Sequence, residues 1–335
     1  MALERGALLG AAALLAMSTG AAAAQDKVTL QLKWVAQAQF AGYFVAKDKG
    51  FYGDVGLEVT INPGGPDIAP PRVIADGAAD VIVEWMPAAL AARESGVALV
   101  NISQTFEKSG LMLTCLKSSG VSGPDKFPGQ TLGVWFFGNE YPFLAWMAKL
   151  GISTEGGAEG VTVLEQGFTI EPLLQKQAAC ISTMTYNEYW QVIDAGYAPE
   201  DLAVFKYSEQ GVQTLEDGLY VLEDRLEDEE FVDRMARFVA ASNRGWAWAR
   251  SNPDAAAEIS LDNDGPGAQT REHQRRMMGE IIKLLGTNEP GKLVEADYER
   301  TVQVLLGSTA TPVISAAPVG AWTHAVFDAA KAHAP

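Results

Sequence analysis

Aromatic side chains accompanied by an amide or a carboxylate recur along this sequence at predicted turns from strand to helix. Trp34 is followed by Gln39, and Glu84 is followed by Trp85. An aromatic face stacks on a flat molecule, and an amide or a carboxylate exchanges hydrogen bonds with the edge of that molecule. The candidate ligand-binding residues of this kind are Trp34, Gln39, Asp67, Trp85, Phe137, Asn139, Tyr186 and Glu188.

Each candidate also has a structural alternative. A tryptophan at the end of a strand commonly packs in the core. Asp67 precedes an apolar segment, so it is a candidate helix cap as well. Because aromatic and polar residues coincide at several predicted strand ends, we favour the interpretation as a binding site.

Signatures of catalysis are missing from the sequence. It contains no Gly-x-Ser-x-Gly elbow, phosphate-binding loop, dinucleotide fingerprint or zinc-ligand spacing. The three histidines, His273, His324 and His333, fall in the last quarter of the chain, where we expect them on surface helices. We therefore predict a binding protein with no cofactor and no bound metal, and not an enzyme.

Strands and helices alternate in the first part of the chain. Alternating apolar residues predict a strand over Val28–Trp34, and a helix follows from about Gln39 until Gly50. Further elements are expected as strands at Gly56–Ile61, Asp80–Trp85 and Val97–Thr105 and as a helix at Pro70–Gly77. This alternation is typical of a parallel sheet, in which ligands bind at the carboxyl ends of the strands.

The following residues repeat the alternation and predict a second lobe. Its expected strands are Leu111–Leu116, Thr131–Phe136, Val161–Gln166 and a segment from Cys180, and Glu216–Val221 is expected to return the chain to the first lobe. We predict an α/β fold of two lobes, each a mainly parallel sheet flanked by helices and hinged by two crossovers. Residues 25–108 and 222–335 form lobe 1 in this prediction, and residues 109–221 form lobe 2.

The start of the chain has the features of a secretory signal peptide. Arg5 precedes an apolar run, Ala7–Met17, and Ala22–Ala24 offers a small-residue cleavage site, so residues 1–24 are the expected signal. We therefore expect an exported, periplasmic protein. The net charge of −17 over 335 residues disfavours nucleic acid or an anionic membrane surface as a partner.

The two cysteines, Cys115 and Cys180, lie in apolar, strand-like runs. In an oxidising compartment such a pair permits one disulfide. Two buried free thiols are the alternative.

Three segments carry a resemblance to a known family. The run KWVAQAQFAGY from Lys33 to Tyr43, followed by Gly50-Phe51-Tyr52, resembles the opening of the THI5/NMT1-like solute-binding proteins of ABC importers. Residues 133–141 and 184–190 resemble matching segments of that family. The resemblance implies a type II periplasmic-binding-protein fold and contacts from Tyr186 and Glu188 to an aminopyrimidine. Pyrimidine-binding relatives usually carry an Asp-Trp-x-Pro-Asn segment with a histidine soon after, whereas this chain has no histidine before position 273.

The predicted function is that of a monomeric receptor that closes on a flat nitrogen heterocycle, such as a thiamine pyrimidine precursor. It would deliver this ligand to an inner-membrane ABC permease. Riboflavin is the alternative ligand, and a pyrimidine-synthesis-type enzyme or a periplasmic sensor or adaptor is the alternative of another class. Anionic ligands such as sulfonates are disfavoured, because Glu140 would repel them and because strand alternation points Lys33, the one cation at these turns, away from Trp34.

Overall fold

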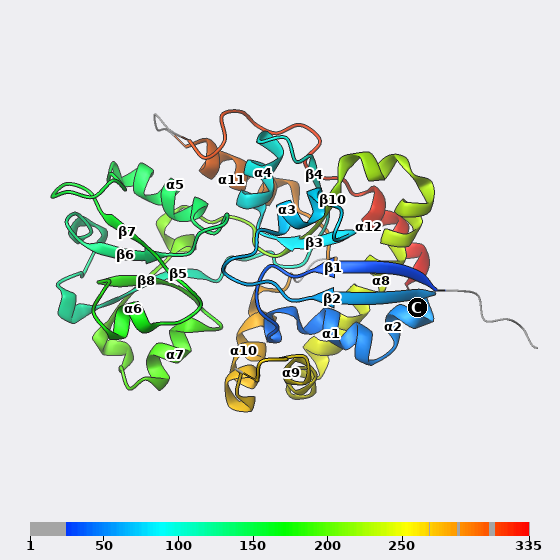
Figure 1. Ribbon diagram of the computed structural model, residues 1–335, viewed down its shortest axis with the longest axis horizontal. Helices are drawn as coiled ribbons and strands as arrows, with labels where there is room; N and C mark the ends of the chain where they lie inside the picture. Colours follow the sequence, from blue (N-terminus) through cyan, green and yellow to red (C-terminus); the bar gives the residue numbers. More distant parts are fainter. Residues whose placement is uncertain (1–24, 268, 287–288, 308–311, 335) are drawn as a thin grey trace, which may run out of the picture.

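The computed structural model describes residues 25–267, 269–286, 289–307 and 312–334. They form two lobes, each built around a five-stranded sheet (Figure 1). The predicted signal peptide at residues 1–24 lies outside the described residues. Within these ranges, no helix combines the length and the apolar character that a membrane crossing requires.

The sheet of lobe 1 has the strand order β2-β1-β3-β10-β4. Its strands are β1 Asp26–Gln31, β2 Leu57–Asn62, β3 Val81–Glu84, β4 Leu99–Gln104 and β10 Gly218–Leu222. The sheet of lobe 2 has the order β7-β6-β8-β5-β9. Its strands are β5 Leu111–Leu116, β6 Thr131–Val134, β7 Thr162–Glu165, β8 Cys180–Met184 and β9 Leu202–Lys206.

One strand in each sheet runs antiparallel to the other four, so both sheets are mainly parallel, as predicted. In lobe 1 this strand is β10, and in lobe 2 it is β5. Each is the first strand after the chain crosses between the lobes, so it runs away from the other lobe. Gly218 therefore pairs with Glu84 and Gln104, the last residues of β3 and β4. The carboxyl ends of the parallel strands consequently meet between the lobes.

Two expected boundaries differ from the structure. Because β10 pairs in the first sheet, the chain has returned to lobe 1 by Gly218, and not after residue 221. The crossovers are residues 105–110 and 211–217. The first strand ends at Gln31, so the expected strand over Val28–Trp34 is too long and Trp34 lies in the loop beyond it.

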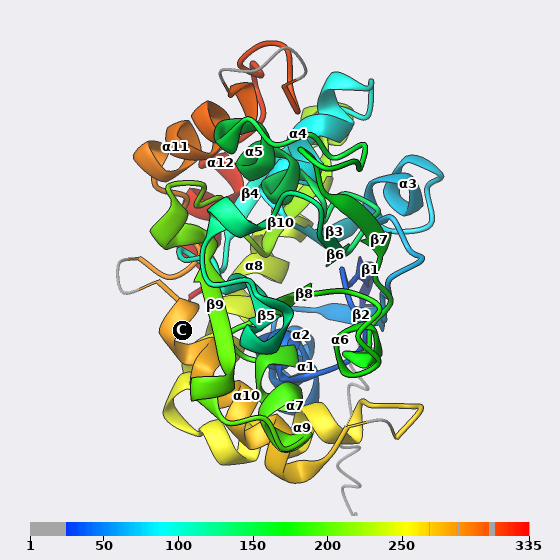
Figure 2. The same ribbon diagram turned by 90° about the vertical axis from the view of Figure 1, so that its left-hand side faces the viewer.

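Helices flank both sheets, and Figure 2 shows lobe 2 from its outer side. The helices are α1 Ala41–Asp48, α2 Phe51–Asp54, α3 Pro70–Ala75, α4 Met86–Glu94, α5 Tyr141–Leu150, α6 Glu171–Leu174, α7 Glu188–Asp194, α8 Glu229–Ser251, α9 Pro253–Asp262, α10 Arg271–Leu284, α11 Glu295–Leu306 and α12 Ala325–Ala330. The long helix α8 packs on α1 and α12. Gly245 allows this close packing, because a Cβ atom there would lie 2.0 Å from the Gly42 carbonyl oxygen.

A disulfide joins two neighbouring interior strands of lobe 2. Cys115 of β5 lies directly opposite Cys180 of β8 in the antiparallel register, and both residues are fully buried. The structure thus contains the disulfide and not the two free thiols that the sequence left as an alternative.

Candidate functional site

A small cavity, with a volume of about 20 Å³, lies where the two lobes meet. Its lining residues are Lys33, Trp34, Gln37, Gln39, Trp85, Trp135, Asn139, Met184, Tyr186 and Glu188. Lobe 1 supplies the first five of them, and lobe 2 supplies the other five. A ligand in this cavity would therefore contact both lobes at once.

Three tryptophans form the aromatic walls, and each follows the end of a parallel strand. Trp34 comes after β1, Trp85 after β3 and Trp135 after β6. Trp34 and Trp135 meet across the lobes with ring centroids 5.8 Å apart and an interplanar angle of 60°. The indole nitrogen of Trp135 donates to the Gly167 carbonyl at 2.9 Å, which fixes the ring. These buried faces are suited to stacking on a flat ligand.

Glu188, the first residue of α7, is the buried acid of the cavity. One carboxylate oxygen accepts from the Met184 backbone N–H at 2.9 Å, and the other accepts from Asn187 Nδ2 at 2.7 Å. Burial raises the pKa of the Glu188 carboxyl to about 7, although these two hydrogen bonds lower it. Each oxygen retains a lone pair, so the group can accept further hydrogen bonds from a ligand.

Asn187 connects Glu188 to the rest of the site. Its Nδ2 donates to Glu188 and, at 3.4 Å, to Gln37 Oε1 of lobe 1. Its Oδ1 accepts from Gln191 Nε2 at 2.9 Å and lies 2.8 Å from His273 Nε2. Because an amide oxygen can only accept a hydrogen bond, His273 Nε2 is the donor in the last contact.

His273 does not lie on the surface, contrary to the sequence-based expectation. It is 9% exposed, because the face of α10 that carries it packs toward Asn187. Burial lowers the pKa of this imidazole, so its neutral form is favoured. The sequence shows only a histidine in a polar helix, and the partner that buries it is 86 residues away.

Lys33 also differs from the expectation. It lines the cavity, is 3% exposed, forms an ion pair with Glu84 and lies 5.1 Å from the ring centroid of Trp85. The argument from strand alternation fails because β1 has already ended at Gln31. The cation is nevertheless compensated by a fully buried carboxylate.

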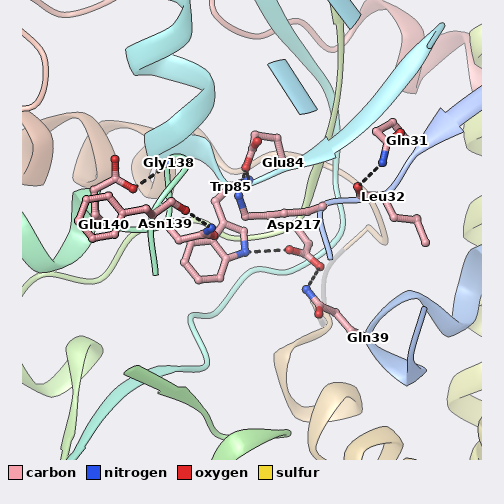
Figure 3. Close-up of polar contacts among 11 residues, drawn as sticks. Gln31, Leu32, Gln39, Glu84, Trp85, Gly138, Asn139, Glu140 and Asp217 are labelled. Carbon is pink, nitrogen blue, oxygen red and sulfur yellow. Dashed lines mark hydrogen bonds and ion pairs between the residues drawn. The ribbon is translucent and has the colours of Figure 1, made fainter. Parts of the chain in front are cut away.

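Gln39 lies in the short 3-10 helix Ala38–Phe40, within a chain of side-chain hydrogen bonds. Its Oε1 accepts from Gln37 Nε2 at 2.8 Å, and its Nε2 donates to Asp217 Oδ2 at 2.8 Å. The other oxygen of Asp217 accepts from the indole nitrogen of Trp85 at 2.9 Å (Figure 3). Asp217 does not line the cavity itself, but it accepts hydrogen bonds from two residues that do, Gln39 and Trp85.

The tight turn after β6 places Asn139 in the lining. Phe137 has a φ of 58° and Gly138 a φ of 95°, and Asn139 Nδ2 donates to the Phe136 carbonyl at 2.7 Å. Glu140 accepts from the Gly138 N–H at 2.8 Å (Figure 3). Burial raises the pKa of Glu140.

Two predicted site residues lie outside the cavity. Phe137 is 44% exposed, and its backbone has a left-handed conformation with a φ of 58°. Asp67 is exposed and does not cap a helix, since α3 begins after Ala69. The other six predicted residues, Trp34, Gln39, Trp85, Asn139, Tyr186 and Glu188, line the cavity together.

The comparison with protein families agrees with this arrangement. Residues 37–256, more than half of the chain, match the family model described as NMT1/THI5 like. The chain belongs to the NMT1/THI5-like family.

Two relatives of this NMT1/THI5-like protein have named ligands. A formylaminopyrimidine-binding protein of Halalkalibacterium halodurans is 24% identical over 242 residues, which cover 72% of this chain and 71% of the relative. A riboflavin-binding protein of Chloroflexus aurantiacus is 26% identical over 243 residues, which cover 70% of this chain and 66% of the relative.

Solved structures share the two-lobe fold at low sequence identity. The periplasmic aliphatic sulphonate-binding protein of Escherichia coli has a TM-score of 0.62 at 11% identity and covers 83% of this chain, with 85% of its own chain aligned. A desulfurization enzyme has a TM-score of 0.58 at 15% identity over 92% of this chain and all of its own. These likenesses establish the periplasmic-binding-protein fold and leave the ligand open.

In this NMT1/THI5-like protein, four lining residues were absent from the predicted set: Lys33, Gln37, Trp135 and Met184. All four lie within the segments that carry the family resemblance, so a local signal existed for each of them. Asp217 had no such signal, because its partners come from distant parts of the chain. Among the described residues, no group of three or more His, Cys, Asp or Glu side chains is arranged to hold a metal ion.

Proposed function

We propose that this protein is the solute-binding component of an ABC importer and that it closes on a flat nitrogen heterocycle, with a thiamine pyrimidine precursor as the leading ligand. The observation that carries the proposal is the cavity between the lobes, in which Trp34, Trp85 and Trp135 surround a buried carboxylate, Glu188. Aromatic walls stack on the ring, and the carboxylate accepts from ring amino or N–H groups.

The charges around the cavity support a ligand without negative charge. Lys33 is the one cation in the lining, and Glu84 already compensates it. Glu188 and Asp217 add carboxyl groups, so the site has no surplus positive charge in any protonation state of these two. A sulfonate or another anion would have to give up its hydration without a free counter-charge, which is costly.

The lobes leave a cavity of only about 20 Å³ in this conformation, which is roughly the space that one water molecule needs. Binding of any ring therefore requires the lobes to lie farther apart, and the cavity volume does not distinguish a single ring from a larger ring system. Riboflavin is the second candidate, supported by the riboflavin-binding relative and by the three tryptophans. A tricyclic flavin would require a wider separation of the lobes than a single ring would.

The proposal extends to the cellular setting. The signal-like residues 1–24 support export to the periplasm. An inner-membrane ABC permease is the proposed receiver of the ligand, and the protein acts as a monomer. A binding role in place of catalysis is supported by the named relatives, both of which are binding proteins.

Intrinsic tryptophan fluorescence tests this function. The mature protein is titrated with a formylaminopyrimidine, riboflavin, thiamine and taurine. We expect saturable quenching at micromolar concentration or below by the formylaminopyrimidine, and no response to taurine. Saturation by taurine in place of the heterocycles, or no response to any heterocycle from folded, ligand-free protein, would overturn the proposal.

Two variants show whether the signal arises in the cavity. Trp135→Phe keeps an aromatic wall but removes one of the indoles, so the amplitude of quenching should fall. Trp248→Phe is the matched control, because Trp248 lies on α8 outside the cavity lining and its loss should leave the ligand-dependent change intact.

A further inference from the structure

The second crossover carries two neighbouring buried acids, Glu216 and Asp217, which are 1% and 2% exposed. Glu216 binds the first crossover and the start of β5. It accepts from Ser109 Oγ at 2.6 Å, from the Gly110 N–H at 3.0 Å and from the Leu111 N–H at 3.2 Å. This side chain therefore joins the two crossovers to each other, and none of its hydrogen-bond partners lines the cavity.

Asp217 points toward the cavity. Its two oxygens accept from Trp85 Nε1 at 2.9 Å and from Gln39 Nε2 at 2.8 Å, as Figure 3 shows. Its backbone carbonyl accepts from the Thr105 N–H at 3.2 Å, at the start of the first crossover. One residue is thus bonded to the connection between the lobes and to two walls of the cavity.

The hydrogen bonds continue from Asp217 across the site. Gln39 Oε1 accepts from Gln37 Nε2 at 2.8 Å. Gln37 Oε1 in turn accepts from Asn187 Nδ2 of lobe 2 at 3.4 Å. In this chain each amide uses its oxygen toward one neighbour and its nitrogen toward another, so the orientation of every member depends on the carboxylate at the end.

We propose that Asp217 is a positioning residue that couples the crossover to the ligand cavity. It fixes the Trp85 indole and the Gln39 amide, so a displacement of the crossover during lobe movement shifts both walls together. Buried carboxylates bind such donors strongly, and losing the acceptor leaves two buried N–H groups without a partner.

The adjacent acids provide a matched pair of variants. Asp217→Asn has one acceptor oxygen and places an NH₂ group against the N–H of Trp85 or of Gln39, so one of the two bonds is lost. Glu216→Gln removes a buried carboxylate of the same crossover, but its partners are Ser109 and backbone N–H groups outside the cavity lining. Both variants should lower the melting temperature, whereas their effects on the cavity should differ.

Two readouts separate positioning from general stability. The first is the affinity for the formylaminopyrimidine or riboflavin, and this arm rests on the proposed function. Asp217→Asn should weaken binding by about tenfold or more, and Glu216→Gln by less than about threefold. The second is the ¹H–¹⁵N resonance of the Trp85 indole, assigned with Trp85→Phe. It should move in Asp217→Asn and stay in place in Glu216→Gln, with or without ligand.

A double-mutant cycle then tests the link itself. Trp85→Phe keeps a ring but has no indole N–H, so Asp217→Asn should cost less affinity in that background than in the wild type. An unmoved indole resonance in Asp217→Asn, or an equal loss of affinity in both acid variants, would overturn the inference. If neither heterocycle binds the wild type, the proposed function fails, and the resonance still decides the positioning role.

One further variant covers the case in which Asp217→Asn does not fold. Gln39→Met removes the second donor to Asp217 while keeping a side chain of similar length. The carboxylate then has the Trp85 N–H as its remaining cavity partner, so the indole resonance should move. An unchanged resonance in Gln39→Met would overturn the inference by itself.

Discussion

The polar side chains of the cavity are hydrogen-bonded to one another and to the buried residues behind them. Gln37 bonds Gln39, Gln39 bonds Asp217, and Asn187 bonds Glu188. These pairs fix the directions in which the remaining lone pairs point. A ligand that matches them binds to groups whose rotamer freedom has already been lost on folding, so less ordering is needed on binding.

Glu188→Gln is the most direct test of the proposed polar anchor. The amide keeps one acceptor, so either the Met184 N–H or Asn187 Nδ2 loses its partner, and the acceptor facing the ligand weakens. We expect the affinity for the heterocycle to fall by about tenfold or more, which is about 1.4 kcal/mol. Isothermal titration calorimetry measures this change.

Glu165→Gln is the control for the loss of one negative charge in lobe 2. Glu165 ends β7, is exposed and lies outside the cavity lining, so its substitution should leave the affinity unchanged. An affinity of Glu188→Gln within about threefold of the wild type, or about 0.65 kcal/mol, would show that Glu188 is not the anchor.

At the scale of elements, local patterns predicted most strands and helices, whereas pairing partners required the structure. The turn after β3 is readable from Glu84, Trp85 and the Pro87 helix start, because all the signals are adjacent. The position of β10 in the first sheet cannot be predicted from local patterns in the same way, because its partners β3 and β4 lie more than a hundred residues earlier in the chain. For the same reason, the sequence did not reveal the roles of Asp217 and His273, which depend on contacts with residues distant in sequence.

The pair of strands β5 and β8 allows a prediction for the disulfide. Cys115 and Cys180 close a loop with a sequence separation of 65 residues, which in the chain-entropy treatment stabilises the fold by about 4 kcal/mol. The variant carrying Cys115→Ala and Cys180→Ala should therefore unfold at lower denaturant concentration than the wild type. The free energy of unfolding from urea titration measures the difference.

The reduced wild type provides the comparison for this variant. It keeps both sulfurs in the core and lacks only the bond, so it separates the effect of the crosslink from that of lost side-chain volume. Equal free energies of unfolding for the oxidised and reduced wild type would show that the bond contributes nothing to stability.

The whole molecule is in a closed conformation. Trp34 contacts Trp135, and Gln37 contacts Asn187, each pair joining one lobe to the other. All ten lining residues of the cavity are less than 9% exposed. A ligand can therefore enter and leave only when the lobes separate, and the closeness of the lobes in the bound state controls the rate of release.

Substitution of Gly138 by alanine adds one methyl group at the contact between the lobes and can therefore change how closely they approach each other. It lies in the turn of lobe 2 after β6, and a Cβ atom there would lie 2.6 Å from the Cβ of Ala88 on α4 of lobe 1. Gly138→Ala should hold the lobes apart. We expect the dissociation rate of the heterocycle to rise by about tenfold, with the association rate within about threefold of the wild type. Stopped-flow fluorescence measures both rates.

Gly120→Ala separates lobe contact from backbone strain. Gly120 also belongs to lobe 2 and has a φ of 86°, close to the 95° of Gly138, but a Cβ atom there meets nothing within 4 Å. Both variants place alanine in a left-handed conformation and carry its strain, whereas only Gly138→Ala presses on the other lobe. If both variants release the heterocycle equally fast, lobe contact at this turn does not govern release. A faster release in Gly138→Ala alone shows that closure retains the ligand.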